Sequence, residues 1–307
     1  MEKYLTIMAQ KRLKIGFIWQ GFSGRYGQWR DGLYRAMKRI EELHDVRYME
    51  PWDDFTGCDV LLYWEAPCTI HGENGEFYRK VKETPIRKAL LYAGGPWTPE
   101  MVEGFDHIFV ESEQNEKEFE MNGISWSRAF GINEDVFFPM DIPKAYDGFM
   151  QATFAAWKRQ PLFAEALGSK GVLCGRYQAN DREPWEHSAQ SIRLPEMPYS
   201  AVNALLNASH TAVNTSEFWG GGQRCTLEAM AAGVPVIVME DSPKNREYVE
   251  ESGAGLVVDP GPIAIREAVE TIKGWSNSYK KRGVEYIKSK WTSKHYADAL
   301  LKWIETK

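Results

Sequence analysis

The sequence predicts an α/β protein made of two Rossmann-like, doubly wound domains. Short, buried apolar runs alternate with helical segments along the whole chain, which is the pattern of a parallel sheet with crossover helices. Several of these runs end in glycine-rich loops, and ligands of open α/β sheets bind at such strand ends. The chain has 307 residues, of which 43% are apolar, and this is enough for two domains of ordinary size.

The first half opens on an apolar strand at residues 13–19, which reads LKIGFIW. A loop with three glycines follows, and then a helix at about residues 29–43. The glycine spacing is not G-x-G-x-x-G, so it gives no dinucleotide fingerprint. Further elements are expected as strands at 46–49, 59–64, 89–92 and 107–110 and an acidic, solvent-facing helix at 113–122.

The second half repeats this alternation without repeating the sequence. Residues 176–187 are polar and are expected to be irregular. Strands are expected at 149–154, 171–174, 191–194, 211–214, 236–239 and within 253–260, and helices at 161–167, 198–208, 226–232, 245–251, 263–275, 279–290 and 291–304.

The strongest indication of function is the stretch from Asn214 to Val238, which reads NTSEFWGGGQRCTLEAMAAGVPVIV. Gly220, Gly221 and Gly222 let backbone N–H groups approach a ligand, and the helix that follows presents free N–H groups and the positive end of its dipole. Together these features predict an anion site, most simply for a phosphate. An ordinary strand–loop–helix crossover is the alternative reading of the glycines alone.

This stretch resembles the signature of GT-B glycosyltransferases, most closely the retaining, family-4-like group of glycosyl transferases group 1. The resemblance is dense over TLEAMAAGVPVI. It implies that the loop amides, with Arg224, Cys225 and Thr226, hold the donor diphosphate, and that Glu228 holds the ribose of the nucleotide. The first Glu of the family's pair would fall at Gly220. We expect a rebuilt loop in which Glu217 reaches the sugar, the other possibility being that this role is lost.

Other donor-site residues follow from the same resemblance. A basic residue after the first strand of the second domain neutralises the diphosphate, which points to Lys158, with Arg159 as a substitute for an Arg that is missing earlier. Backbone groups at the end of the strand near Arg193 and Leu194 would bind the base. Catalysis is therefore assigned to Lys158, Glu217 and Glu228.

The resemblance also divides the chain and locates the acceptor. Residues 1–139 would form the acceptor-side domain, residues 140–290 the donor domain, and helix 291–307 would pack back on the first domain. The loop after the first strand would face the cleft between the domains. The candidates on the acceptor side, for each of which a solvated loop or cap role is the alternative, are Arg25, Tyr26, Trp29, Asp31, Trp64, Glu65, Gly94 and Gly95.

The implied reaction is transfer of a sugar from a UDP- or GDP-linked donor to an acceptor hydroxyl, with retention and without a metal. No D-x-D motif or metal-ligand spacing is present in the sequence. The acceptor could be a glycan, a lipid-linked molecule, a small molecule or a modified DNA base. Alternatives are a catalytically weakened nucleotide-sugar binding protein and a different enzyme on the same fold, such as an epimerase or phosphorylase.

The composition bears on the kind of acceptor and on the location of the protein. With 37 basic and 43 acidic residues the net charge is −6, which argues weakly against a nucleic-acid acceptor. The four cysteines, Cys58, Cys68, Cys174 and Cys225, are scattered and fit reduced thiols. The first residues do not read as a signal peptide, and no apolar run is long enough to span a membrane. A cytoplasmic location is therefore expected.

Overall fold

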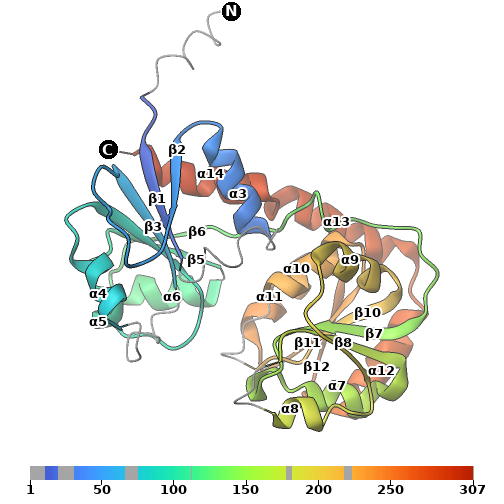
Figure 1. Cartoon of the computed structure of the whole chain (residues 1–307). Helices are drawn as coiled ribbons and strands as arrows, with labels where there is room; N and C mark the ends of the chain where they lie inside the picture. The colour runs from blue at the N-terminus through green and yellow to red at the C-terminus, as the bar shows by residue number, and fades with distance from the viewer. Residues whose placement is uncertain are drawn as a thin grey trace, which may run out of the picture.

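The chain folds into two parallel, six-stranded sheets, each with helices on both faces (Figure 1). The computed structural model describes residues 11–19, 31–65, 75–111, 113–177, 182–217 and 223–306. The strand orders are β2-β1-β3-β4-β5-β6 and β12-β11-β10-β7-β8-β9, so the chain leaves each sheet centre in both directions. The predicted fold class, an α/β protein with two doubly wound domains, is confirmed.

The first domain packs α3 and α14 on one face of its sheet and three other helices on the opposite face. Its elements are β1 (Lys14–Ile18), α3 (Gly32–Glu41), β2 (Asp45–Met49), β3 (Val60–Glu65), α4 (Gly75–Glu83), β4 (Arg87–Tyr92), α5 (Pro99–Val102), β5 (His107–Val110), α6 (Glu113–Met121) and β6 (Trp126–Arg128).

The second domain packs α9, α10 and α11 on one face and α7 and α12 on the other. Its elements, followed by the last two helices of the chain, are β7 (Tyr146–Gln151), η2 (Ala156–Lys158), α7 (Gln160–Leu167), η3 (Gly168–Lys170), β8 (Gly171–Cys174), α8 (Glu183–Glu186), β9 (Ile192–Leu194), α9 (Tyr199–Asn207), β10 (Ser209–Asn214), α10 (Gln223–Ala231), β11 (Val236–Met239), α11 (Pro243–Ser252), β12 (Gly255–Val258), α12 (Pro262–Lys273), α13 (Asn277–Lys290) and α14 (Ser293–Ile304).

Two local predictions were wrong, and some elements were not foreseen. The strand expected at 149–154 is β7, which begins and ends three residues earlier, because the charge of Asp147 in this strand is matched by Lys273 at 2.9 Å. The polar segment 176–187 contains the short helix α8, with Pro184 in its first turn, where a missing N–H costs nothing. The short edge strand β6 and the helices α4 and α5 were not foreseen.

The chain passes from one sheet to the other between β6 and β7, and this link includes Pro139, near which the domain boundary was expected. The last helix, α14, lies against α3 of the first domain (Figure 1). Gly32, the first residue of α3, touches the link so closely that a Cβ there would lie 1.8 Å from the carbonyl oxygen of Gly131.

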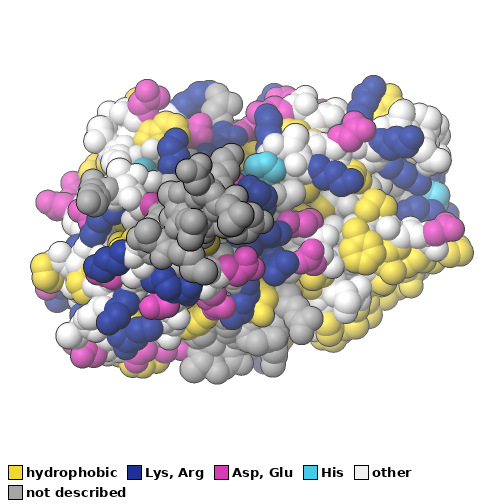
Figure 2. Space-filling model, turned by 90° about the horizontal axis from the view of Figure 1, so that it is seen from above, with side chains coloured by type: hydrophobic (Ala, Val, Ile, Leu, Met, Phe, Trp, Pro, Cys, Tyr) yellow, Lys and Arg dark blue, Asp and Glu magenta, His cyan; other side chains and the backbone are white. Residues whose placement is uncertain are grey.

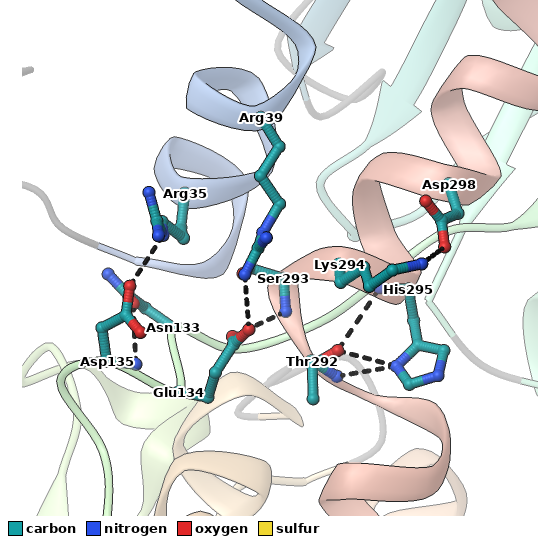
Figure 3. A network of polar contacts seen from close by, with 10 residues as sticks. All are labelled: Arg35, Arg39, Asn133, Glu134, Asp135, Thr292, Ser293, Lys294, His295 and Asp298. Atoms are coloured by element: carbon teal, nitrogen blue, oxygen red, sulfur yellow. Dashed lines mark hydrogen bonds and ion pairs between the residues drawn. The ribbon is translucent and has the colours of Figure 1, made fainter. Parts of the chain in front are cut away.

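Polar contacts tie α3, the link and α14 together at this joint (Figure 3). Glu134 of the link accepts hydrogen bonds from Arg39 at 3.0 Å and from the backbone N–H of Ser293 at 2.9 Å. Burial alone would raise the pKa of Glu134, but the hydrogen bonds from Ser293 and the nearby charge of Arg39 lower it. Beside it, Arg35 pairs with Asp135 at 2.7 Å. The two domains therefore meet at a joint fixed by charged side chains as well as by close backbone packing.

The face of the molecule on which α14 lies carries basic and acidic side chains interspersed over its described part (Figure 2). Among the described helices, none is long and apolar enough to cross a lipid bilayer.

Candidate functional site

A cavity of about 460 Å³ lies between the two domains, where the carboxyl ends of strands from both sheets meet. This size is typical of pockets that hold small molecules or cofactors. Its described lining comprises Phe17, Trp19, Asp31, Gly32, Leu33, Tyr34, Trp64, Ala93, Gly94, Gly95, Glu111, Phe130, Gly131, Gln151, Ala152, Thr153, Trp157, Lys158, Cys174, Gly175, Arg176, Glu196, Met197, Tyr199, Val202, Arg224, Cys225, Lys244 and Tyr296.

Lys158 reaches this cavity from the short η2 helix that follows β7. The backbone around it is held in place, because its carbonyl accepts the hydroxyl hydrogen bond of Thr215 at the end of β10. Burial lowers the pKa of Lys158 to about 8; the charge of Arg224 adds to this shift, and Cys225 opposes it. A lysine that is held out of water beside another cation is well placed to gain an anionic partner.

Arg224 and Glu228 lie one turn apart on α10; Arg224 lines the cavity, whereas Glu228 is not among the described lining residues. Arg224 Nε is 3.6 Å from Glu228 Oε1, which is an ion pair but too long for a hydrogen bond. Both carboxylate oxygens of Glu228 lack a hydrogen-bond partner among the described residues, and the side chain is fully buried. Burial raises the pKa of Glu228 to about 8, although Arg224 opposes this shift. A carboxyl group in this state has unused capacity to accept hydroxyl hydrogen bonds.

Arg224 also reaches across the cavity to the other domain. Its Nη1 lies 3.1 Å from Oδ2 of Asp31, while Oδ1 of Asp31 caps α3 by accepting from the N–H of Tyr34 at 2.8 Å. Tyr199 lies beneath the guanidinium, with 5.8 Å between the group and the ring centre. The pair therefore joins the start of α10 to the start of α3.

The hydroxyl of Thr226 is directed into the protein, not toward a ligand. It donates to Asn245 at 2.8 Å and accepts from Asn214 at 3.1 Å, and Thr226 is buried. Since both functions of the hydroxyl are occupied, the contact from Thr226 to phosphate that the resemblance implies would have to come from its backbone N–H and not from its hydroxyl. Cys225 does line the cavity, and burial raises the pKa of its thiol to about 11, which keeps it protonated.

Arg159 is not among the residues that line the cavity. Its guanidinium makes a bidentate pair with Asp241 at 2.7 and 2.8 Å and donates to the carbonyl of Thr215 at 2.7 Å. Arg159 has φ 51, the left-handed conformation, which these contacts hold in place. Arg159 thus braces the loop that presents Lys158, and the structure does not bring it to the place expected for a second diphosphate ligand.

Neither Arg193 nor Leu194, at the end of β9, is among the described lining residues. Arg193 packs on the ring of Trp185, 4.6 Å from its centre, and donates to its carbonyl. The carbonyl of Leu194 already accepts from Gly175 at 3.3 Å. Glu196 and Met197, just beyond this strand, line the cavity in their place.

Several predicted residues lie outside the described part of the chain: Arg25, Tyr26, Trp29, Gly220, Gly221 and Gly222. Glu217 is described and exposed; its backbone N–H donates to the carbonyl of Trp157 at 3.1 Å, and it is not among the lining residues.

On the acceptor side, Gly94 and Gly95 line the cavity with φ values of 94 and 85, which a residue with a side chain rarely adopts. Glu65 does not line it. Successive strand side chains point to opposite faces of a sheet, and Glu65 shares the far face with Tyr63, whose hydroxyl donates to it at 3.4 Å. The expected acceptor role of Glu65 was therefore wrong, whereas its neighbour Trp64 lines the cavity.

Sequence reasoning missed three lining residues of note, Glu111, Lys244 and Trp157. Glu111 follows β5 directly, so the rule that ligands bind beyond strand ends could have found it. Lys244 lies in the first turn of α11, where it is nearly fully buried and its pKa is lowered by that burial. No motif marks Lys244 or Trp157.

Among the described residues, no group of three or more His, Cys, Asp or Glu side chains is arranged to hold a metal ion.

Comparison with known proteins identifies the class. Solved structures with the same fold include sucrose-phosphate synthase from Thermosynechococcus elongatus (TM-score 0.75, 14% identity, covering 95% of this chain and 98% of that one). HepE from Anabaena, solved in complex with UDP and glucose, has a TM-score of 0.74 at 12% identity and covers 96% and 100%. A glycosyltransferase from Rickettsia africae has a TM-score of 0.72 at 12% identity and covers 97% and 100%. These similarities define the fold as GT-B.

The chain itself carries a recognisable domain of that class. Residues 172–288 match the family described as "Glycosyl transferases group 1". No curated protein gives a significant match to the chain. The domain match and the fold together indicate that the chain is a glycosyltransferase.

Proposed function

We propose that the chain transfers a sugar from a nucleotide-diphosphate sugar, UDP- or GDP-linked, to an acceptor hydroxyl, with retention and without a metal. In this reaction the bond from the anomeric carbon to the phosphate oxygen breaks, the bond to the acceptor oxygen forms, and the acceptor proton leaves with the nucleoside diphosphate. The negative charge that develops on the diphosphate needs fixed positive groups.

One observation carries this proposal: the second domain contributes Lys158 and Arg224 to the cavity lining, and the buried carboxyl of Glu228, 3.6 Å from Arg224, lacks a hydrogen-bond partner among the described residues. Two cations suit a diphosphate, and a buried carboxyl with free acceptor capacity suits the two hydroxyls of a ribose. HepE, which shares the fold, was solved with UDP and glucose bound, and this supports a UDP-linked donor.

Further assignments extend this proposal. The amides of Gly220, Gly221 and Gly222 would complete the diphosphate site beside Cys225, and the donor domain would comprise residues 140–290. Acceptor-side roles of Arg25, Tyr26 and Trp29 belong to the same proposal. A location in the cytoplasm is proposed from the composition.

A binding protein with weakened turnover is the second candidate. The exposed position of Glu217, outside the described cavity lining, favours it, because no other acid was expected to contact the donor sugar there. Release of nucleoside diphosphate from a panel of nucleotide sugars, measured with and without acceptors, separates an enzyme from a binding protein.

The donor site is tested by thermal unfolding with nucleotides and nucleotide sugars. A ligand at 100 times its Kd stabilises the native state by about 2.7 kcal/mol, which raises the Tm by roughly 5 °C or more for a chain of this size. We expect UDP or GDP to produce such a shift, and Lys158→Ala and Glu228→Ala to remove most of it.

The matched control is Lys170→Ala, because Lys170 is a largely exposed lysine outside the cavity. This variant should keep the full shift. If no nucleotide raises the Tm of the unaltered protein, or if Lys158→Ala responds as strongly as Lys170→Ala, the donor-site assignment is wrong.

A further inference from the structure

The first domain presents a row of side chains from one face of its sheet toward the cavity. Parallel pairing places Ile18 beside Tyr63, so Trp19 is level with Trp64. Leu91 pairs with Phe109, and Glu111 therefore follows two residues further along, on the same face as Phe109. Trp19, Trp64 and Glu111 all line the cavity.

The two tryptophans form an aromatic corner. Their rings meet edge to face, with 5.5 Å between ring centres and 79° between planes. The face of an aromatic ring carries negative charge, so it attracts weakly positive C–H groups. One face of a sugar ring consists largely of such C–H groups, whereas its hydroxyls project around the rim.

Glu111 supplies a polar group at the same edge of the sheet. Its backbone carbonyl accepts the hydroxyl hydrogen bond of Tyr248, which fixes Glu111 at the contact between the domains. Its side chain interacts electrostatically with Lys244, Arg224 and Asp31, all of which line the cavity. Burial raises the pKa of Glu111 to about 7, which Lys244 and Arg224 partly oppose. A carboxylate accepts hydrogen bonds and thus suits a ligand hydroxyl.

Charge divides the described lining between the domains. The positively charged residues all come from the second domain: Lys158, Arg176, Arg224 and Lys244. The described lining of the first domain contributes the acids Asp31 and Glu111 and no cation, whereas the second domain adds one acid, Glu196, to its four cations. Among the described lining residues of the first domain, an anionic acceptor would therefore meet like charge, whereas an uncharged one would not.

We propose that the acceptor is a neutral saccharide, one ring of which packs on Trp19 and Trp64 while one of its hydroxyls donates to Glu111. This inference rests on the proposed glycosyl transfer, since it names the acceptor of that reaction. Trp64 sets the stacking surface, and Glu111 orients the hydroxyl. Phosphorylated or carboxylated sugars bind more weakly, because their negative charge meets Asp31 and Glu111.

Saturation-transfer NMR on the full chain tests this, with the nucleoside diphosphate that gives the largest thermal shift present at saturation. The probes are neutral methyl glycosides, their 6-phosphates, glucuronic acid and 5-hydroxymethylcytidine. Neutral glycosides are expected to bind, with the strongest transfer to the C–H groups of one ring face. Trp64→Ala should weaken this binding at least tenfold, and Glu111→Gln about threefold to tenfold.

Two comparisons separate binding from folding effects. Trp64→Phe keeps an aromatic face and should retain most of the affinity, while Trp52→Ala and Glu103→Gln change exposed residues outside the cavity and should bind normally. The variants at Trp64, Trp52 and Glu103 should bind the nucleotide as the unaltered protein does. Preference for the charged or nucleoside probes, or equal binding by Trp64→Ala and Trp52→Ala, overturns the saccharide inference.

The outcomes also distinguish this inference from the proposed function. If the nucleotide binds and no neutral glycoside does, the acceptor inference fails and the donor site stands. If no nucleotide binds, the proposed function fails and the acceptor inference fails with it.

Discussion

The guanidinium of Arg224, on the donor-domain helix α10, lies 3.1 Å from the carboxylate of Asp31, which caps α3 in the other domain. Arg224 also lies 3.6 Å from Glu228 on the same helix, so its guanidinium is close to two acidic side chains. Asp31 gives Arg224 the same kind of negative partner that a diphosphate would give it, so the two compete for one cation. The pair therefore couples occupation of the donor site to the contact between the domains.

Asp31→Asn should strengthen binding of a nucleoside diphosphate. The amide oxygen can still cap α3, but the competing negative charge is removed from Arg224. A change of roughly 1 kcal/mol, the scale of one charge at about 4 Å in water, corresponds to about fivefold in Kd. Isothermal titration with UDP and GDP measures it.

Asp135→Asn is the matched control, because Asp135 forms a similar pair with Arg35 of α3 at 2.7 Å but does not line the cavity. Its nucleotide affinity should equal that of the unaltered protein. Weaker binding by Asp31→Asn would mean that the pair supports the donor site instead of competing with it.

Glu228 should make the protein less stable as the pH rises from about 5 to 8. Its pKa is about 8 in the native state, against an ordinary value of 4.5, so the native state holds a proton that the unfolded state releases in this range. The stabilisation from Glu228 is fully present at a pH below the pKa of the group in the unfolded state. It is lost as the pH rises through the pKa of the group in the native state. The effect is on the order of 2–3 kcal/mol or more.

Glu228→Gln removes this titration, because an amide stays neutral throughout. Urea denaturation at pH 5.5 and pH 8.5 gives the free energy of unfolding of the variant and of the unaltered protein. Relative to the unaltered protein, the variant should be more stable at pH 8.5 than it is at pH 5.5. Glu103→Gln, at an exposed position, should show no such shift. A difference that is the same at both pH values would contradict the buried, proton-holding state of Glu228.

The strand-and-helix order could be predicted because the signals are local. Buried apolar runs such as β5, β8 and β11 have the bounds that the sequence indicated. β6 was missed because three residues at a sheet edge, WSR, have no apolar run, and only pairing with β5 makes them a strand. The start of β7 was missed for a related reason. Asp147 is an unfavourable residue for a strand, and its charge is compensated by Lys273, which is distant in the sequence.

Site residues could be predicted where a sequence motif marks them. They could not be predicted where the direction of a side chain determines whether it reaches the cavity. Lys158, Arg224 and Cys225 reach the cavity as expected from their motif positions. Glu65 was misjudged, because the sequence does not show which side of the sheet its side chain faces, and the bond from the Thr226 hydroxyl to Asn245 was equally hidden from it. Glu228 is buried more deeply than a ligand residue usually is, a consequence of the alanines around it on α10.

The ion pair between Arg159 and Asp241, which supports the loop that carries Lys158, leads to a separate prediction. Asp241→Ala should lower the free energy of unfolding by about 1 kcal/mol or slightly more, because it breaks a bidentate pair that also holds Arg159 at positive φ. The pair is partly exposed, so water screens part of its energy. Since Lys158 precedes Arg159 directly, nucleotide affinity should fall as well.

Glu250→Ala provides the comparison, since it breaks an exposed i,i+4 pair with Arg246 on α11. Such helix pairs contribute about 0.3–0.5 kcal/mol. Urea unfolding and nucleotide titration of both variants give the answer. Equal stability losses, with nucleotide binding intact in both, would show that the bidentate pair is not a brace.

Gly32→Ala tests the joint between the domains. Alanine is the better helix former by about 1 kcal/mol, so helix propensity alone predicts a gain in stability. The added methyl group, however, would lie 1.8 Å from the carbonyl oxygen of Gly131 and 2.8 Å from Cα of Ile132, and both are backbone atoms that cannot rotate away. We therefore expect a loss of about 3 kcal/mol or more in the free energy of unfolding, measured by urea denaturation.

Gly274→Ala is the matched substitution, because a Cβ there meets only one atom within 4 Å, the carbonyl oxygen of Thr271 at 3.4 Å, which is an ordinary contact. Its stability should change by less than about 1 kcal/mol. The same clash at residue 32 would push α3 away from the link, and with it Asp31 from Arg224, so Gly32→Ala should also lose the coupling that Asp31→Asn reveals. A Gly32→Ala protein as stable as Gly274→Ala would mean that α3 can move at little cost and that the joint is not rigid.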